Sequence, residues 1–100
     1  MQLFIDTANI AEIREAACWG VVAGATTNPK LLSHEGTSFD LRERVLAIAD
    51  LVGGPVSVEV LCEEPDQMLI EARLYASWHP SIVVKIPMSL SGMKVVNRLE

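Results

Sequence analysis

The sequence predicts an α/β protein in which parallel β-strands alternate with helices. Four short apolar segments begin near residues 3, 21, 56 and 81, and apolar residues at helical spacing follow each of them. A helical crossover returns the chain to the same end of a sheet, so consecutive strands pair in parallel. No linker, low-complexity tract or charge run interrupts the pattern, and we expect residues 1–100 to form one unit.

Local signals set the expected boundaries. The strands are predicted at residues 3–5, 21–26, 56–61 and 81–86. The helices are predicted from Ile10 to a stop at Gly20, over about 38–52, from Pro65 to Trp78, and from a cap at Ser91 to the last residue. Thr37 with Asp40 three residues later fits a capping box for the second of these helices.

Right-handed crossovers leave two architectures for such a chain, an open doubly wound sheet or a (β/α) barrel. Four βα units are half of an eightfold barrel. In either architecture ligands bind at the carboxyl ends of the strands.

Composition excludes several classes of protein. Half of the residues are hydrophobic and 21% are charged, which is typical of a soluble globular chain. The net charge of −5 argues against nucleic-acid or anionic-membrane partners. No apolar run is long enough to cross a bilayer, and no basic segment precedes the first one, so we expect a cytoplasmic protein. Cys18, Cys62, His34 and His79 lack the spacing of a metal site.

Polar side chains stand at the predicted end of every strand. Asp6 ends the first strand, Thr26 and Asn28 follow the second, Glu59 lies near the end of the third, and Lys85 lies on the fourth. Because the carboxyl ends of parallel strands meet at one edge, the sequence predicts a site there.

Alternation along the third strand assigns its two faces. Val56, Val58 and Val60 share the face that suits packing under helices, so Ser57 and Glu59 are predicted to face a barrel interior. A carboxylate in such a place usually persists because another group pairs with it or uses it.

Lys85 is the most informative of these residues, and its pattern allows two interpretations. Its apolar neighbours in residues 82–87 would disfavour the charged ammonium, and a neutral amine is a nucleophile towards carbonyl carbon. Alternatively, its stem packs on those neighbours while its head reaches solvent. Asp6 followed by Thr7 is, on pattern alone, better explained as the cap of the first helix, and Asn28 as part of a turn.

Three collinear segments together resemble the transaldolase family, and most closely its small single-domain branch, which includes fructose-6-phosphate aldolase. They are residues 4–9 (FIDTAN), 26–29 (TTNP) and 83–87 (VVKIP), and residues 54–60 (GPVSVEV) fit the same pattern. The resemblance spans essentially the whole chain.

The resemblance implies a (β/α)₈ barrel, of which this chain covers about the first four units, and metal-free class I aldolase chemistry. It matches Lys85 to the lysine that forms a Schiff base and Asp6 to the acid/base carboxylate. It matches Asn28 to an amide that hydrogen-bonds substrate near the imine, and Thr26 to a hydroxyl in the same site. It matches Glu59 to a group that acts through a bound water during imine formation.

The implied activity is transfer of a dihydroxyacetone unit between sugar phosphates, as in the pentose phosphate pathway. Aldolase-only members tend to carry glutamine where this chain has Glu59, so the carboxylate favours transfer over a fructose-6-phosphate aldolase-type reaction. Family members run to roughly twice this length and often form homo-oligomers, so full activity is expected to need further strands. The alternatives are a non-catalytic, self-associating half-barrel and a deoxyribose-phosphate-type aldolase, which fits Lys85 but not residues 26–29.

Overall fold

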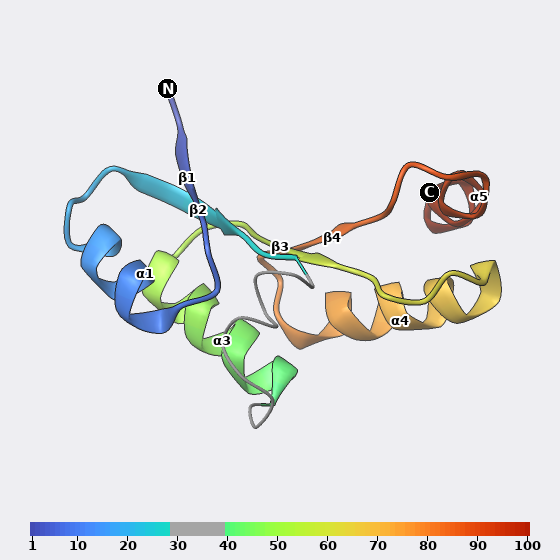
Figure 1. Ribbon diagram of the computed structural model, residues 1–100, viewed down its shortest axis with the longest axis horizontal. Coiled ribbons are helices and arrows are strands. Elements are labelled where there is room, and N and C mark those ends of the chain that lie inside the picture. The colour runs from blue at the N-terminus through green and yellow to red at the C-terminus, as the bar shows by residue number, and fades with distance from the viewer. Residues whose placement is uncertain (29–39) are drawn as a thin grey trace.

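A computed structural model of the chain describes residues 1–28 and 40–100. Within these ranges four parallel strands form one sheet in the order β1-β2-β3-β4 (Figure 1). The strands are β1 (Leu3–Asp6), β2 (Val22–Thr26), β3 (Val56–Glu59) and β4 (Ile82–Lys85), and the helices are α1 (Ile10–Ala17), α3 (Leu41–Val52), α4 (Pro65–Trp78) and α5 (Leu90–Leu99). The predicted alternation, parallel pairing and sequential order are confirmed, and β3 and β4 are shorter than expected.

Each described helix begins where a side chain accepts a hydrogen bond from an amide of its first turn. The capping residues are Asn9, Asp40, Glu64 and Ser89. Such a bond satisfies one of the amides that the first helical turn leaves without a backbone partner.

The predicted starts of α5 and α3 were wrong. Ser89 caps α5 through a 3.0 Å bond from the Gly92 amide, and Ser91 lies inside the first turn. Asp40 itself caps α3 through a 3.0 Å bond from the Glu43 amide, so that helix begins at Leu41 rather than near residue 38. The other partner of the predicted capping box, Thr37, lies outside the described residues.

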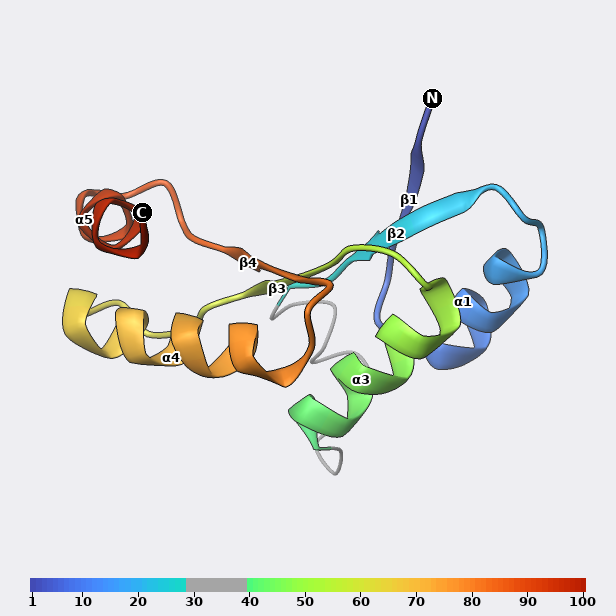
Figure 2. The ribbon, with the colours of Figure 1, turned by 180° about the vertical axis from the view of Figure 1, so that it is seen from behind.

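The helices α1, α3 and α4 lie on one side of the sheet, and α5 packs beside α4 (Figures 1 and 2). The valine side chains of β3, Val56 and Val58, point to this side and are fully buried, and Val60, directly after the strand, is 3% exposed. They join a core formed by sheet and helix residues: Ile13, Ala25, Val45, Ile48, Ala49, Met68, Leu69, Ala72, Tyr75 and Val95. The predicted assignment of the valine face is therefore confirmed.

In residues 1–28 and 40–100, no helix covers the opposite face of the sheet, the open face. Phe4 and Val83 lie on it and are 46% and 52% exposed. Parallel sheets are normally covered on both faces, either by helices or by closure into a barrel. Sequential parallel strands with helices on one face are the arrangement of consecutive units in a (β/α)₈ barrel, whose interior would be this open face.

Candidate active site

The strand register brings four of the five predicted site residues, together with Ser57, to one edge and one face of the sheet. Asp6 is aligned with Thr26, and Thr26 with Ser57. Two residues farther along β3, Glu59 is aligned with Lys85. Aligned residues of parallel strands share a face, as do residues two apart on one strand, so all five side chains belong to the open face. The structure thus confirms that the strand ends place these residues on a common rim.

Asp6 is exposed at the end of β1 and accepts a 2.7 Å hydrogen bond from the hydroxyl of Thr26. The expectation that Asp6 caps the first helix was wrong. Asn9 caps α1 by accepting a 2.9 Å bond from the Glu12 amide. The reason is that β1 continues through Asp6 and α1 begins only at Ile10, so the Asp6 carboxylate remains on the sheet face.

The residue after Thr26 points the other way and fixes the end of β2. Thr27 is 1% exposed, its hydroxyl donates a 2.7 Å bond to the Ser57 carbonyl oxygen, and its amide donates to the same oxygen at 3.1 Å. These two bonds hold the end of β2 against β3, which keeps Thr26 on the open face. Asn28 follows and is half-buried.

Glu59 and Lys85 are neighbours across β3 and β4. Their strands run about 4.8 Å apart, as in any parallel pair, and the Val60 amide donates a 3.2 Å bond to the Lys85 carbonyl oxygen. Glu59 is half-buried. Such neighbours can share a bound water or transfer a proton through one.

Lys85 is exposed, which agrees with the interpretation in which its head reaches solvent. Alternation along β4 sends Ile82 and Val84 towards the helices, while Val83 shares the open face with Lys85 and is itself exposed. Burial of this amine requires a cover on the open face.

Asp6 and Lys85 are not brought together. Their strands, β1 and β4, are separated by three strand spacings, which is about 14 Å in a flat sheet. The described residues therefore form two pairs on one rim, Asp6 with Thr26 and Glu59 with Lys85. Curvature of the sheet into a barrel would shorten the distance between the pairs.

Sequence reasoning missed Glu71, which organises the loop after β3. Its carboxylate accepts hydrogen bonds from the Leu61 amide at 2.9 and 3.0 Å, from the Cys62 amide at 2.9 Å, and from the Tyr75 hydroxyl. Only the four-residue spacing to Tyr75 is visible in the sequence, where it predicts a shared helix face. No local pattern indicates that Leu61, ten residues earlier, is a partner.

The surroundings of Glu71 favour its charged form. Burial raises the pKa of this carboxyl, but the bonds from the Cys62 amide, the Tyr75 hydroxyl and the Leu61 amide outweigh burial, and the pKa falls below its ordinary value of 4.5. Burial, followed by the bond to Glu71, raises the pKa of Tyr75. A hydrogen bond to Glu71, followed by burial, raises the pKa of the Cys62 thiol. The Glu71 carboxylate is thus a single negative charge surrounded by hydrogen-bond donors.

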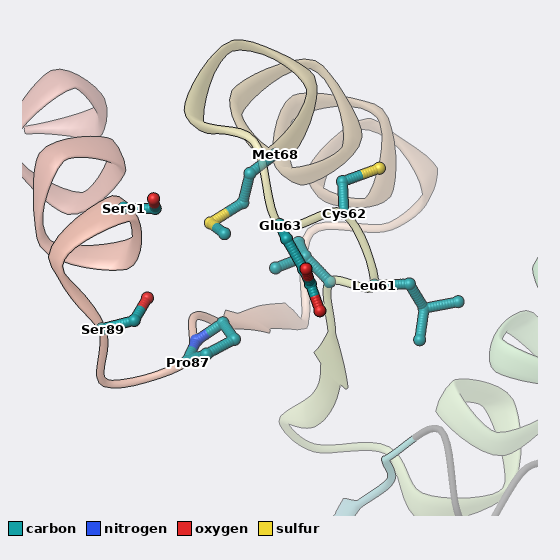
Figure 3. A pocket seen from close by; sticks show the side chains of 8 residues that line it. Leu61, Cys62, Glu63, Met68, Pro87, Ser89 and Ser91 are labelled. Atoms are coloured by element: carbon teal, nitrogen blue, oxygen red, sulfur yellow. The ribbon is translucent and has the colours of Figure 1, made fainter.

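A cavity of about 400 Å³ opens beside this rim, between the loop after β3 and the loop after β4 (Figure 3). Ser89 and Ser91 at the start of α5 face Met68 and Glu63 across it. The full lining is Val60, Leu61, Cys62, Glu63, Met68, Pro87, Ser89 and Ser91. None of the five predicted site residues is among these lining residues, so the cavity adjoins the candidate site without containing it.

The described parts of the chain contain neither a cluster of metal ligands nor a helix that could span a membrane. In residues 1–28 and 40–100, no three His, Cys, Asp or Glu side chains are grouped closely enough to hold a metal ion. Cys18 is exposed and Cys62 half-buried, both as free thiols. His34 lies outside the described residues. No helix in the described ranges has the length and apolar character needed to cross a bilayer.

Comparison with known proteins decides the family. Residues 3–100 match the family model described as transaldolase/fructose-6-phosphate aldolase. The chain belongs to this family. It is 48% identical over 99 residues to a probable transaldolase of Roseiflexus sp. (strain RS-1), covering 99% of this chain and 45% of the relative. It is 51% identical over 100 residues to a probable transaldolase of Desulforudis audaxviator (strain MP104C), covering 100% of this chain and 46% of the relative.

The chain therefore spans less than half the length of these transaldolase-family relatives and corresponds to their N-terminal part. Membership of the family confirms the resemblance found in the sequence. Together with four sequential parallel βα units, it identifies the fold as part of a (β/α)₈ barrel.

Neutralising Glu71 is expected to destabilise the protein in a pH-dependent way. Because the folded-state pKa of Glu71 is depressed, its contribution is present above the ordinary value of 4.5 and is lost as pH falls through the folded-state pKa. After allowance for solvent screening, Glu71→Gln should lower the free energy of unfolding at pH 7 by about 1 kcal/mol. Urea unfolding of the intact protein at pH 7 and pH 3.5 measures this.

The matched control is Glu15→Gln, which removes a carboxylate from the exposed side of α1 and should change stability by less than about 0.5 kcal/mol. Equal destabilisation by Glu71→Gln at both pH values would contradict the assignment of a charged, hydrogen-bonded carboxylate to Glu71.

Proposed function

We propose that this chain supplies the Schiff-base lysine and the acid/base carboxylates of a transaldolase-type enzyme that acts in the cytoplasm. The enzyme would transfer a dihydroxyacetone unit between sugar phosphates. The observation that carries the proposal is the placement of Asp6–Thr26 and Glu59–Lys85 on one face at the carboxyl ends of the strands, in a chain of this family.

Lys85 would start the reaction. Its amine attacks the ketose carbonyl carbon, a carbon–nitrogen bond forms, and the carbonyl oxygen becomes a hydroxyl. Loss of that hydroxyl as water gives an iminium. Glu59, on the adjacent strand and at the same register position, would take the proton that the Lys85 ammonium loses before attack and return it to the departing hydroxyl, directly or through a bound water.

Asp6 would serve carbon–carbon cleavage. It takes the proton from the hydroxyl on the carbon that becomes the aldehyde, and the bond's electron pair moves into the iminium to form an enamine. The aldose phosphate leaves, and the three-carbon unit stays on Lys85. A second aldehyde then accepts this unit, Asp6 returns the proton, and hydrolysis frees the amine. The Thr26 hydroxyl, 2.7 Å from Asp6, holds the carboxylate in orientation.

Substrate binding would use the same rim. Asn28, half-buried directly after β2, is proposed to hydrogen-bond the substrate near the imine, and Thr26 to line that site. An amine must be uncharged to attack, and Lys85 is exposed. We therefore propose that the catalytic form has the open face covered, as closure of an eightfold barrel would do.

A self-associating, non-catalytic half-barrel is the second candidate. The exposed Phe4 and Val83 on the open face favour it, because a second copy could cover the apolar surface. A homo-oligomer is compatible with both candidates. A fructose-6-phosphate aldolase-type reaction would use the same groups and differ in releasing free dihydroxyacetone, and the carboxylate at Glu59 makes us favour transfer.

Borohydride trapping should label Lys85. Intact protein incubated with fructose 6-phosphate and sodium borohydride is expected to carry a reduced adduct on Lys85, located by peptide mass spectrometry. Lys85→Met should abolish the adduct. Lys94→Met, which removes an exposed lysine of α5, should leave it unchanged. An adduct on another lysine, or none at all as for a non-catalytic module, would contradict the proposal.

Replacing Asp6 should separate imine formation from bond cleavage. Asp6→Asn keeps an oxygen that can accept the bond from Thr26 but is a poor base, so turnover should fall by about 10² to 10⁴. The borohydride-trapped adduct with fructose 6-phosphate should persist. Thr26→Val, which removes only the orienting hydroxyl, should lower turnover by about tenfold. If Asp6→Asn lowers adduct formation by the same factor as turnover, the role given to Asp6 is contradicted.

A further inference from the structure

The backbone that follows Glu59 is held at three successive amides. The Val60 amide donates to the Lys85 carbonyl oxygen at 3.2 Å. The next two amides, of Leu61 and Cys62, both donate to the Glu71 carboxylate. Successive amides of an extended strand point to opposite sides, so two adjacent amides on one carboxylate mark the place where the strand stops and turns. Glu71 therefore binds the backbone at the point where the chain leaves β3.

Glu71 is itself held firmly. It lies within α4, and the Tyr75 hydroxyl one turn later donates to its carboxylate. Tyr75 is 5% exposed, and its ring lies 4.9 Å, centroid to centroid, from the ring of Trp78. A buried aromatic residue thus orients the carboxylate that receives the loop amides.

We propose that Glu71 is a positioning residue that sets the place of the Glu59 carboxylate relative to Lys85. Only Val60 separates Glu59 from Leu61, the first amide bound by Glu71. A shift of the loop after β3 would consequently move the end of that strand. Small displacements of reacting groups lower the reaction rate strongly. The inference rests on the catalytic role proposed above for Glu59.

A purely structural role for Glu71 makes a different prediction. If Glu71 only stabilised the fold, its loss would slow the reaction equally whether or not a carboxylate stood at position 59. If Glu71 acts through Glu59, its loss should matter only while that carboxylate is present. The two effects are then coupled, and a double-mutant cycle measures the coupling.

The experiment measures the single-turnover rate of Lys85 adduct formation with fructose 6-phosphate, using borohydride quenching of the intact protein. Four proteins are compared: the wild type, Glu71→Gln, Glu59→Ala and the double variant. We expect Glu71→Gln to slow adduct formation by about tenfold in the wild-type background and by less than about twofold beside Glu59→Ala. Glu15→Gln should match the wild type.

If Glu71→Gln slows adduct formation by the same factor with Glu59 and with Ala at position 59, the inference is overturned. Should Glu71→Gln lack a native circular-dichroism spectrum, Tyr75→Phe enters the same cycle, because it keeps both amide bonds and removes only the hydroxyl. Tyr75→Phe should slow adduct formation by about threefold, and only in the protein that retains Glu59. If the wild-type protein forms no Lys85 adduct, both the proposed function and this inference are overturned. If the adduct forms but the substitution slows it equally in both backgrounds, only this inference is overturned.

Discussion

The two-residue alternation of β3 is the constraint on which the candidate site depends. Its two valines and Val60, directly after it, are buried in the core, and each contributes roughly 1.5 kcal/mol or more by burial. Turning the strand over to bring Glu59 to the helix side would expose all three. Glu59 is therefore held on the open face by the core, and the parallel register with β4 places Lys85 beside it.

The open face explains both what the described chain provides and what the proposed chemistry still needs. It carries two pairs, Asp6 with Thr26 and Glu59 with Lys85, whose outer members Asp6 and Lys85 lie on strands about 14 Å apart across a flat sheet. It also carries exposed apolar side chains, which make it a surface to be covered. Closure of the sheet into a barrel would cover this face, desolvate the Lys85 amine and bring the two pairs closer. Burial of the apolar side chains and the proposed reaction therefore both require barrel closure.

Much of the fold could be predicted from the sequence because its signals are local and periodic. The apolar strands, the helical spacing between them and the faces of β3 follow from periods of two and 3.6 residues, and all are confirmed. Helix starts were less predictable, since Ser89 and Ser91, or Asp6 and Asn9, are equally suitable caps in sequence. Only the actual end of the preceding strand decides between them.

The position of the candidate residues on one rim could be predicted from the sequence, but the side chains around them could not. Position at a strand end identifies Asp6, Glu59 and Lys85, because all strand ends of a parallel sheet share an edge. The sequence left open whether Lys85 is desolvated or reaches solvent, because the period of two sends Ile82 and Val84 to the other face and local composition alone does not show this. Glu71 was missed because its amide partners lie across a turn that only the tertiary structure brings within hydrogen-bonding distance.

A crystal structure of the intact protein with the borohydride-reduced three-carbon adduct tests the central claim most directly. We predict that Glu59 and Lys85 lie on the same face, inside a closed barrel, with the Glu59 carboxylate within about 3.2 Å of the adduct or of one water bound to it. A Glu59 side chain directed towards the helices, or an adduct nitrogen with no carboxylate or bridging water in reach, would contradict it.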